Sequence, residues 1–466
     1  MPDFTFLSRD QAQALAKRVL SFSKADEARV NMSSAWEGNT RFAANQITTA
    51  GGATDTTVTV TSTIGRRRAS AQTNVLDDAS LRRTVELSER LARLAPEDPE
   101  IMPELGPQQY AAVTGAYAER TAELTPEARA LAVKRVLEGA AAPTGAGASV
   151  DPSTLFVAGF LQANAGMSSA VATSKGLFAY HTTTGVDLST TVRTPDGTGS
   201  GYATGGARDW GQLDPAALGR RAAQKAIASR NPVAIEPGAY TVVLEPQAVS
   251  DLLPLMLGSF NARSSDEGRS AFSKAGGGSK VGEKIADERV TLYSDPADPD
   301  LLEQPFDNDG QPVGRTVWVE NGVLRNLAYS RYWAQKQGKT PTGGGGGGGG
   351  GGFGGPAGGL KMVGGTKTTD ELVASTERGI LVTRFWYIRF LDQRTVLVTG
   401  LTRDGTFLIE NGKVTRPLKN FRFNESPLFM LNKLDDLGRA ERVSTGLVVP
   451  SLKVKDFTFT SLSDAV

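Results

Sequence analysis

Apolar residues follow a helical spacing at the start of the chain and then alternate with polar residues. Leu15, Val19 and Phe22 lie on one face of a predicted helix, which Ser8 opens with Gln11 as its capping-box partner. Apolar and polar residues then alternate in "ARVNMSS", "RFAANQITTA" and "TTVTVTSTI", the last with threonine and valine on alternate positions. This alternation predicts half-buried strands.

Three more helices and a second set of strands are predicted in the first half. One helix is expected from Asp78 to Leu94, and another begins at Thr125-Pro126 and ends near Gly139. Asp214 caps a helix that ends near Arg230. Separate strands are expected at "TLFVAGFLQAN", "SSAVATS", "LFAYHTTT", "VDLSTTVR" and "GSGYATGGARDW". This half therefore mixes helices with a mostly antiparallel sheet.

The second half is richer in strands. "AYTVVLEP" predicts a strand, and an apolar helix is expected from Pro246 to Leu257. Asn321-Gly322 and Asn411-Gly412 predict type I′ hairpins, because both turn positions need positive φ. The run "TPTGGGGGGGGGGFGGPAGG" predicts a flexible Gly-rich loop at 343–359, since polyglycine stabilises neither helix nor strand.

These patterns predict an α+β fold of two domains. Residues 1–231 are expected to form an N-terminal α+β domain, and residues 232–466 a strand-rich C-terminal domain. The boundary is expected near Asn231-Pro232. A chain of 466 residues can bury cores of this size.

Charge and hydropathy exclude several classes of function. Lys+Arg 51 nearly balances Asp+Glu 50, so no overall field favours nucleic acid or an anionic membrane. The basic run Arg66-Arg67-Arg68 has no aromatic neighbours and is read as a solvated strand end. Apolar runs such as "LLPLML" are too short to cross a bilayer, and no secretory signal is visible. The expected location is cytoplasmic.

Few residues are available for metal or nucleophilic chemistry. The chain has one histidine, His181, and no cysteine, so an ordinary zinc site cannot be built from it. A magnesium or calcium site made only of carboxylates stays open. "DNDG" at Asp307 to Gly310 is read as a turn, because the downstream glutamate of a calcium loop is missing. His181 is read as structural, since no nucleophile elbow is present.

An ordered series of segments resembles the TldD/PmbA (TldD/TldE) family of metallopeptidase subunits. "TRFAANQIT" and "GSGYATGGARD" resemble family segments of the N-terminal half. "GAYTVVLEPQAVSDLL", "DEGRSAF", "GSKVGEKIADERVTLYSDP", "FDNDGQPVGRTVWVENGVLRNLAYSRYWA" and "FLIENGKVTRPLKN" then follow in the family's order. The resemblance covers about Trp36 to Asn420.

The resemblance also implies where a metal motif would stand. Active family members carry HExxxH on the helix after the "VVLEP" strand and take another ligand from a C-terminal cysteine. Laid on that motif, this chain reads Pro254-Leu255-Met256-Leu257-Gly258-Ser259. Pro254, Leu255 and Ser259 occupy the positions of the motif's first histidine, glutamate and second histidine. The resemblance therefore implies no catalytic, metal-binding or cofactor-binding residue in this chain.

The sequence is most similar to the family's non-catalytic TldE/PmbA-type subunit. This similarity implies a dimer with an HExxxH-bearing TldD-like subunit, or with a second copy, in which zinc belongs to the partner. Unfolded peptide would be the substrate, held as an added strand. Two alternatives stay open: a stand-alone peptide-binding or scaffold protein, and a hydrolase with a new site at acids such as Asp266 and Glu267.

Overall fold

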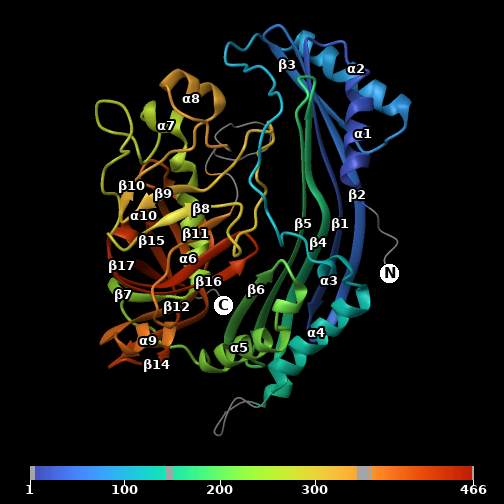
Figure 1. The fold of residues 1–466 in the computed structure, drawn as a ribbon. Helices are drawn as coiled ribbons and strands as arrows, with labels where there is room; N and C mark the ends of the chain where they lie inside the picture. The colour runs from blue at the N-terminus through green and yellow to red at the C-terminus, as the bar shows by residue number, and fades with distance from the viewer. Residues whose placement is uncertain (1–5, 143–150, 344–355, 357–358, 464–466) are drawn as a thin grey trace.

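The protein is described by a computed structural model that covers residues 6–142, 151–343, 356 and 359–463. Two bodies of secondary structure lie side by side (Figure 1). A tall sheet of the N-terminal half carries its helices on the side away from the C-terminal half. The C-terminal half is a compact, strand-rich body on the other side of that sheet. The predicted α+β class is confirmed.

The first sheet is antiparallel throughout. Its six described strands follow the order β3-β2-β1-β4-β5-β6. Their bounds are β1 Glu27–Ala43, β2 Gln46–Ile64, β3 Arg67–Thr73, β4 Phe156–Thr173, β5 Phe178–Arg193 and β6 Ser200–Ala207.

Several strands are longer than predicted. "RFAANQITTA" is not one strand, because the chain turns at Ala44 and Asn45, which have φ of 48° and 64°. The segments expected as separate strands between 154 and 193 are instead two continuous strands, β4 and β5. The register shift between Met167 and Ser169 lets β4 continue past the irregular residues that the sequence pattern takes for a break.

Helices cover one face of this sheet. Even-numbered residues of β1 point to that face: Val30 and Met32 pack with α1 and α2, whereas Trp36 and Phe42 pack near α4 and α5. The helical segments are α1 Arg9–Leu20, α2 Asp78–Leu94, α3 Glu119–Ala122, α4 Pro126–Ala141, α5 Pro215–Ala228, and the short 3-10 turns η1 Pro152–Thr154 and η2 Trp210–Gln212.

The predicted helix starts are confirmed. Ser8 accepts a hydrogen bond from Gln11 N, and Gln11 returns one to the Ser8 backbone, as a capping box requires. Thr125 caps α4 with Pro126 in its first turn. Asp214 caps α5 in the same way. Local cap chemistry therefore fixes where these helices begin.

The second sheet contains a closed barrel. Among the described residues, hydrogen-bonded pairs join β7 to β12, β12 to β13, β13 to β15, β15 to β17 and β17 back to β7. The strands are β7 Ala239–Leu244, β8 Leu292–Ser294, β9 Thr316–Glu320, β10 Val323–Leu324, β11 Leu360–Met362, β12 Arg378–Asp392, β13 Leu397–Glu410, β14 Lys413–Pro417, β15 Asn420–Glu425, β16 Leu434–Ser444 and β17 Leu447–Ser463.

Aromatic side chains fill the barrel. Phe385, Phe423 and Phe457 pack with ring centroids 4.5 to 5.7 Å apart. These rings belong to one buried cluster with the helical segments of this half. Those segments are α6 Pro246–Leu252, η3 Leu253–Phe260, α7 Ala262–Asp266, α8 Arg331–Gln337, α9 Thr369–Ala374 and α10 Pro427–Asn432.

Both Asn-Gly hairpins are confirmed. Asn321 and Gly322 have φ of 50° and 76°, and Asn411 and Gly412 have φ of 51° and 72°. They join β9 to β10 and β13 to β14. Most of the predicted Gly-rich loop, residues 344–355 and 357–358, lies outside the described residues.

Candidate functional site

The segment that aligns with the metal motif is a tight 3-10 helix. We expect an α-helix from Pro246 to Leu257, but α6 ends at Leu252 and η3 continues to Phe260. Pro254 explains the change, since proline donates no backbone hydrogen bond and crowds the preceding turn of an α-helix. The prediction of one long helix is therefore wrong beyond Leu252.

The three motif positions offer almost nothing to a metal. Leu255 packs against the core of the second half, beside the buried Leu253 and Met256. Ser259 is buried, and its carbonyl accepts hydrogen bonds from the hydroxyls of Ser265 and Ser270. Pro254 has no donor atom in its side chain. Zinc takes thiolate, imidazole or carboxylate ligands, so these residues do not fit it.

Acidic and histidine side chains do not gather elsewhere into a metal site. Within residues 6–142, 151–343, 356 and 359–463, no group of three or more His, Cys, Asp or Glu side chains could hold a metal ion. Nor does this described part of the chain include a helix long and apolar enough to cross a membrane.

His181 lies on β5 and is 7% exposed. Its Nε2 atom has no hydrogen-bond partner among the described residues. Burial, with the positive charge of Arg208, lowers the pKa of His181 to about 4. The imidazole is therefore neutral near pH 7. The described structure places no activated nucleophile beside it.

Arg208 joins the two halves close to His181. Its guanidinium donates to Thr183 Oγ1 at 2.8 Å and to the Thr184 carbonyl at 3.1 Å. On the other half it donates to the Leu301 carbonyl at 3.1 Å and to Glu303 Oε1 at 2.9 Å. Burial raises the pKa of Glu303 although Arg208 opposes the shift. Arg208 thus acts as a buried connection between the halves.

Asp266 and Glu267 are occupied by other groups. Asp266 accepts a hydrogen bond from Trp333 Nε1 at 2.7 Å. Glu267 contacts Arg269 and pairs with Arg263 at 2.9 Å. Hydrogen bonds from Arg269 and Arg263 lower the pKa of Glu267, which suits a structural carboxylate better than a general acid.

Two arginines of the basic run Arg66–Arg68 donate hydrogen bonds to other parts of this chain. Arg67 donates to the Ala95 carbonyl at 2.7 Å. Arg68 donates to Thr63 Oγ1 at 2.9 Å and to the Met102 carbonyl at 2.9 Å. These contacts hold the extended segment after α2 against the first sheet, so the run is not simply a solvated strand end.

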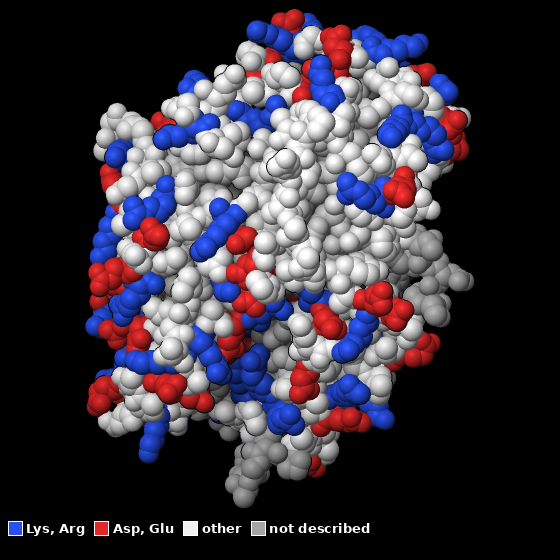
Figure 2. Space-filling view, viewed as in Figure 1, with Lys and Arg blue, Asp and Glu red and all other residues white. Residues whose placement is uncertain are grey.

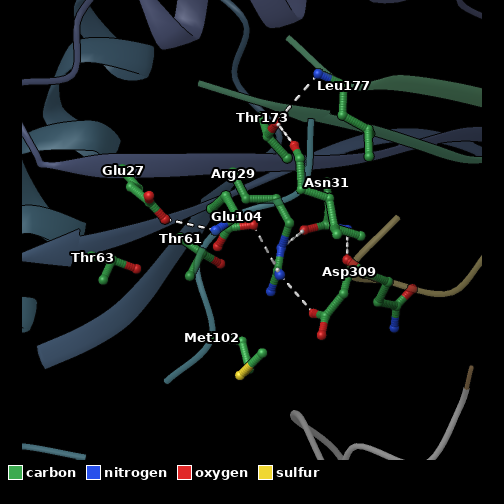
Figure 3. Close-up of polar contacts among 12 residues, drawn as sticks. Glu27, Arg29, Asn31, Thr61, Thr63, Met102, Glu104, Thr173, Leu177 and Asp309 are labelled. Carbon is green, nitrogen blue, oxygen red and sulfur yellow. Dashed lines mark hydrogen bonds and ion pairs between the residues drawn. The ribbon is translucent and has the colours of Figure 1, made fainter. Parts of the chain in front are cut away.

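That segment brings Glu104 between the two halves (Figure 3). Arg29 lies 3.3 Å from the Glu104 carboxylate and 2.6 Å from Asp309, and Arg68 lies 3.1 Å from Glu104. We call Arg29, Arg68, Glu104 and Asp309 the Glu104 cluster. Burial raises the pKa of Glu104 more than the two arginines lower it. The Asp307–Gly310 turn therefore serves to dock the C-terminal half.

A pocket opens where the halves join near Asn231-Pro232. Its volume is about 370 Å³, and its lining includes Ser200, Asp404 and Thr406. Ser200 Oγ donates to Asp404 Oδ1 at 2.5 Å, which occupies one oxygen of that buried carboxylate. The other oxygen lies 3.5 Å from Arg384. The carboxylate is thus already committed to groups of this chain.

The second half of β12 exposes a feature that sequence reasoning missed. Trp386 is 45% exposed and Tyr387 is 63% exposed. Arg389 also lies exposed beside them, and Arg403 and Arg422 lie on the neighbouring strands β13 and β15. We call Trp386, Tyr387, Arg389, Arg403 and Arg422 the β12 patch. The signal was the run "RFWYIRFL", in which two arginines flank a group of aromatic residues.

Figure 2 shows how charge is distributed on one face of the molecule. Lysine and arginine side chains gather at its lower centre, over the region where α5 and β12 lie. Lys225 of α5 pairs with Glu245 at 2.5 Å, across the junction of the halves. Basic side chains therefore concentrate where the first sheet meets the barrel.

The described residues form an α+β protein built on two sheets. Models of one family match most of the chain: the PmbA/TldA metallopeptidase central domain over residues 126–230 and the C-terminal domain over residues 237–461. The chain belongs to the PmbA/TldD family.

Curated relatives include metalloproteases. A metalloprotease of Methanothermobacter thermautotrophicus is 27% identical over 60% of this chain and 62% of the relative. A metalloprotease TldD homologue of Buchnera aphidicola is 24% identical over 38% of this chain and 40% of the relative. The chain thus spans less than two thirds of the length of these relatives.

Solved structures share the fold. TldE from Thermococcus kodakarensis aligns with a TM-score of 0.81 at 19% identity, over 96% of this chain and 99% of that chain. A Thermotoga maritima protein described as a candidate modulator of a DNA gyrase aligns with a TM-score of 0.81 at 21% identity, over 96% and 100% of the two chains. At these identities the likeness concerns the fold alone.

Proposed function

We propose that this chain is the non-catalytic subunit of a cytoplasmic TldD/TldE-type metallopeptidase. It holds an unfolded peptide while an HExxxH-bearing partner subunit cleaves it. One observation carries the proposal: a family member has a proline, a leucine and a serine where the family's motif would stand, with the leucine packed against the apolar core and the serine buried. Domain 1–231 would serve pairing, and domain 232–466 would contact the peptide.

The division of labour follows from what each chain offers. Peptide hydrolysis needs an activated water and a peptide held in an extended form. The described residues of this chain hold no cluster for the first task. The long first sheet and the exposed β12 segment offer surface for the second.

A cleavage assay tests the proposal. This chain alone should leave an unfolded peptide intact, and together with an HExxxH-bearing family member of the same organism it should support cleavage that a chelator abolishes. His181→Ala should leave the pair active, because the neutral imidazole has no catalytic task. Chelator-sensitive cleavage by this chain alone would refute the proposal, as would about one zinc ion per isolated chain in elemental analysis.

A further inference from the structure

We propose that the β12 patch binds an extended peptide segment in which acidic and apolar side chains alternate. This inference rests on the proposed function, in which a partner subunit cleaves the peptide that this chain binds. It adds a class of ligand and the residues that select it.

Strand register places the patch on the outside of the barrel. Phe385 and its partner Thr402 are buried, so the adjacent pair of Trp386 and Leu401 points outward. Leu401 also pairs with Arg422 on β15. Trp386 therefore shares one outer row of the barrel with Arg422.

Arginines surround the exposed rings. The guanidinium of Arg384 lies 4.9 Å from the Trp386 ring centroid and 4.1 Å from that of Tyr202, which belongs to β6 of the first sheet. Arg403 lies 5.1 Å from the Trp386 ring. Arg389 lies 4.5 Å from the Tyr387 ring. Such stacking orients the guanidinium groups, and the two side chains still stay 45% and 63% exposed.

Tyr387 occupies a costly conformation. Its φ is 55°, in the left-handed region that bulky residues rarely adopt. The register of β12 with β13 shifts at this point, between Trp386 and Arg389, so Tyr387 projects from a bulge. A large aromatic side chain kept exposed at such a position points to a binding role.

The charge of the patch indicates the chemistry of its ligand. Neither Arg389 nor Arg422 forms an ion pair with any residue that the structure describes. The nearby carboxylate of Asp404 is buried, is bonded to Ser200 and already pairs with Arg384 and Arg403, so it does not serve Arg389 or Arg422. A second copy docked through the same patch would oppose arginine to arginine, which disfavours self-association by this surface. Carboxylates on the ligand would instead complete the pairs.

The edge of β12 favours an extended ligand. β13 pairs with one edge of the segment that carries the patch, but β7 pairs with the other edge only from Ile380 to Val382, so no described strand covers that edge beside the patch. Trp386 and the exposed Phe390 and Leu391 follow along this segment. An extended peptide running beside them can place apolar side chains on the rings and acidic ones at the arginines.

Fluorescence anisotropy on the isolated full chain tests the inference. The probe is a labelled, unstructured peptide of alternating glutamate and leucine, and its counterpart has lysine at each glutamate position. We expect the acidic peptide to bind at least about tenfold more tightly, since a charge-assisted contact is typically worth more than 1.4 kcal/mol. Arg389→Glu and Trp386→Ala should each weaken binding of the acidic peptide about tenfold.

The matched control is Arg416→Glu, on β14 of the same half but outside the patch, which should bind the acidic peptide like the wild type. Equal affinity for both peptides, or unchanged binding by the patch variants, would overturn the inference. So would patch variants that bind peptide normally but fail to assemble with the metallopeptidase subunit, because the patch would then be a subunit interface. If the acidic peptide bound more tightly but the chain supported no cleavage by the metallopeptidase subunit, the proposed function alone would be contradicted.

Discussion

Arginines of this protein occur in two contrasting settings. In the Glu104 cluster, Arg29 and Arg68 meet a fully buried carboxylate of the same chain, and Asp309 of the C-terminal half adds a second one. In the β12 patch, Arg389 lies exposed over the Tyr387 ring and Arg422 lies exposed on β15, and neither forms an ion pair with the described residues.

The difference separates charge used for assembly from charge left for a ligand. An arginine whose partner lies in the other half of the chain contributes to docking of the halves. An arginine oriented by a ring but lacking a carboxylate contributes little to folding, because exposed charges gain little in water. The two settings therefore predict opposite consequences: loss of stability at the first and loss of binding at the second.

The largest effect is expected on removing the shared carboxylate. Glu104→Ala should reduce the free energy of unfolding by about 3 kcal/mol, because it leaves Arg29 and Arg68 buried with fewer partners. Denaturant unfolding at pH 7 measures the change. The control Glu97→Ala, at a carboxylate 66% exposed beside Arg67, should cost less than about 1 kcal/mol. Equal losses for the two variants would contradict the assembly role.

The second test concerns His181, a buried imidazole that stays neutral beside Arg208. The pKa of His181 is about 4 in the folded chain and about 6.5 when unfolded. The unfolded chain thus takes up the proton first, and stability is lost as pH falls from about 6.5 to 4, by roughly 3 kcal/mol. His181→Gln should remove this part of the pH dependence, as shown by unfolding at several pH values. An unchanged profile would mean that the imidazole is exposed to solvent.

Asp251 should shift stability in the opposite direction. It lies beneath the β12 patch, where Phe385 N donates to its carboxylate at 2.8 Å. Burial raises its pKa to about 6 from a usual 3.8, so the folded chain holds the proton longer and stability falls as pH rises between those values. Asp251→Asn should therefore gain stability relative to wild type, by about 2 kcal/mol, from pH 4 to 6.5. A variant that loses relative stability over this range would contradict burial of the ionised carboxylate.

Local patterns predicted much of the fold but not its long-range register. The caps at Ser8, Thr125 and Asp214 and both Asn-Gly turns depend on neighbouring residues, so the sequence sufficed. The unbroken β4 and the closure of the barrel by β7 and β17 depend on pairing between distant segments, which alternation alone does not specify.

The site shows the same division. The sequence already shows that Pro254, Leu255 and Ser259 replace the motif's histidines and glutamate, and the apolar residues around them predicted packing. The β12 patch was missed because its meaning depends on which arginines find carboxylates. Arg403 and Asp404 are adjacent in sequence and pair at 3.8 Å, yet the other oxygen of Asp404 accepts a hydrogen bond from Ser200 of the other half. Only the three-dimensional pairing distinguishes Arg389 from Arg29.

The smallest effect on stability is expected at Tyr387, where the patch can be separated from folding. Tyr387→Ala and Tyr387→Gly both remove the ring, but only glycine adopts a φ of 55° without strain. The glycine variant should therefore be more stable than the alanine variant by about 1 kcal/mol in denaturant unfolding. Both should lose affinity for the acidic peptide equally, because binding depends on the ring and not on backbone strain. If the glycine variant retained wild-type affinity, the exposed ring would have no part in binding, and the contrast between the two arginine settings would lose its functional meaning.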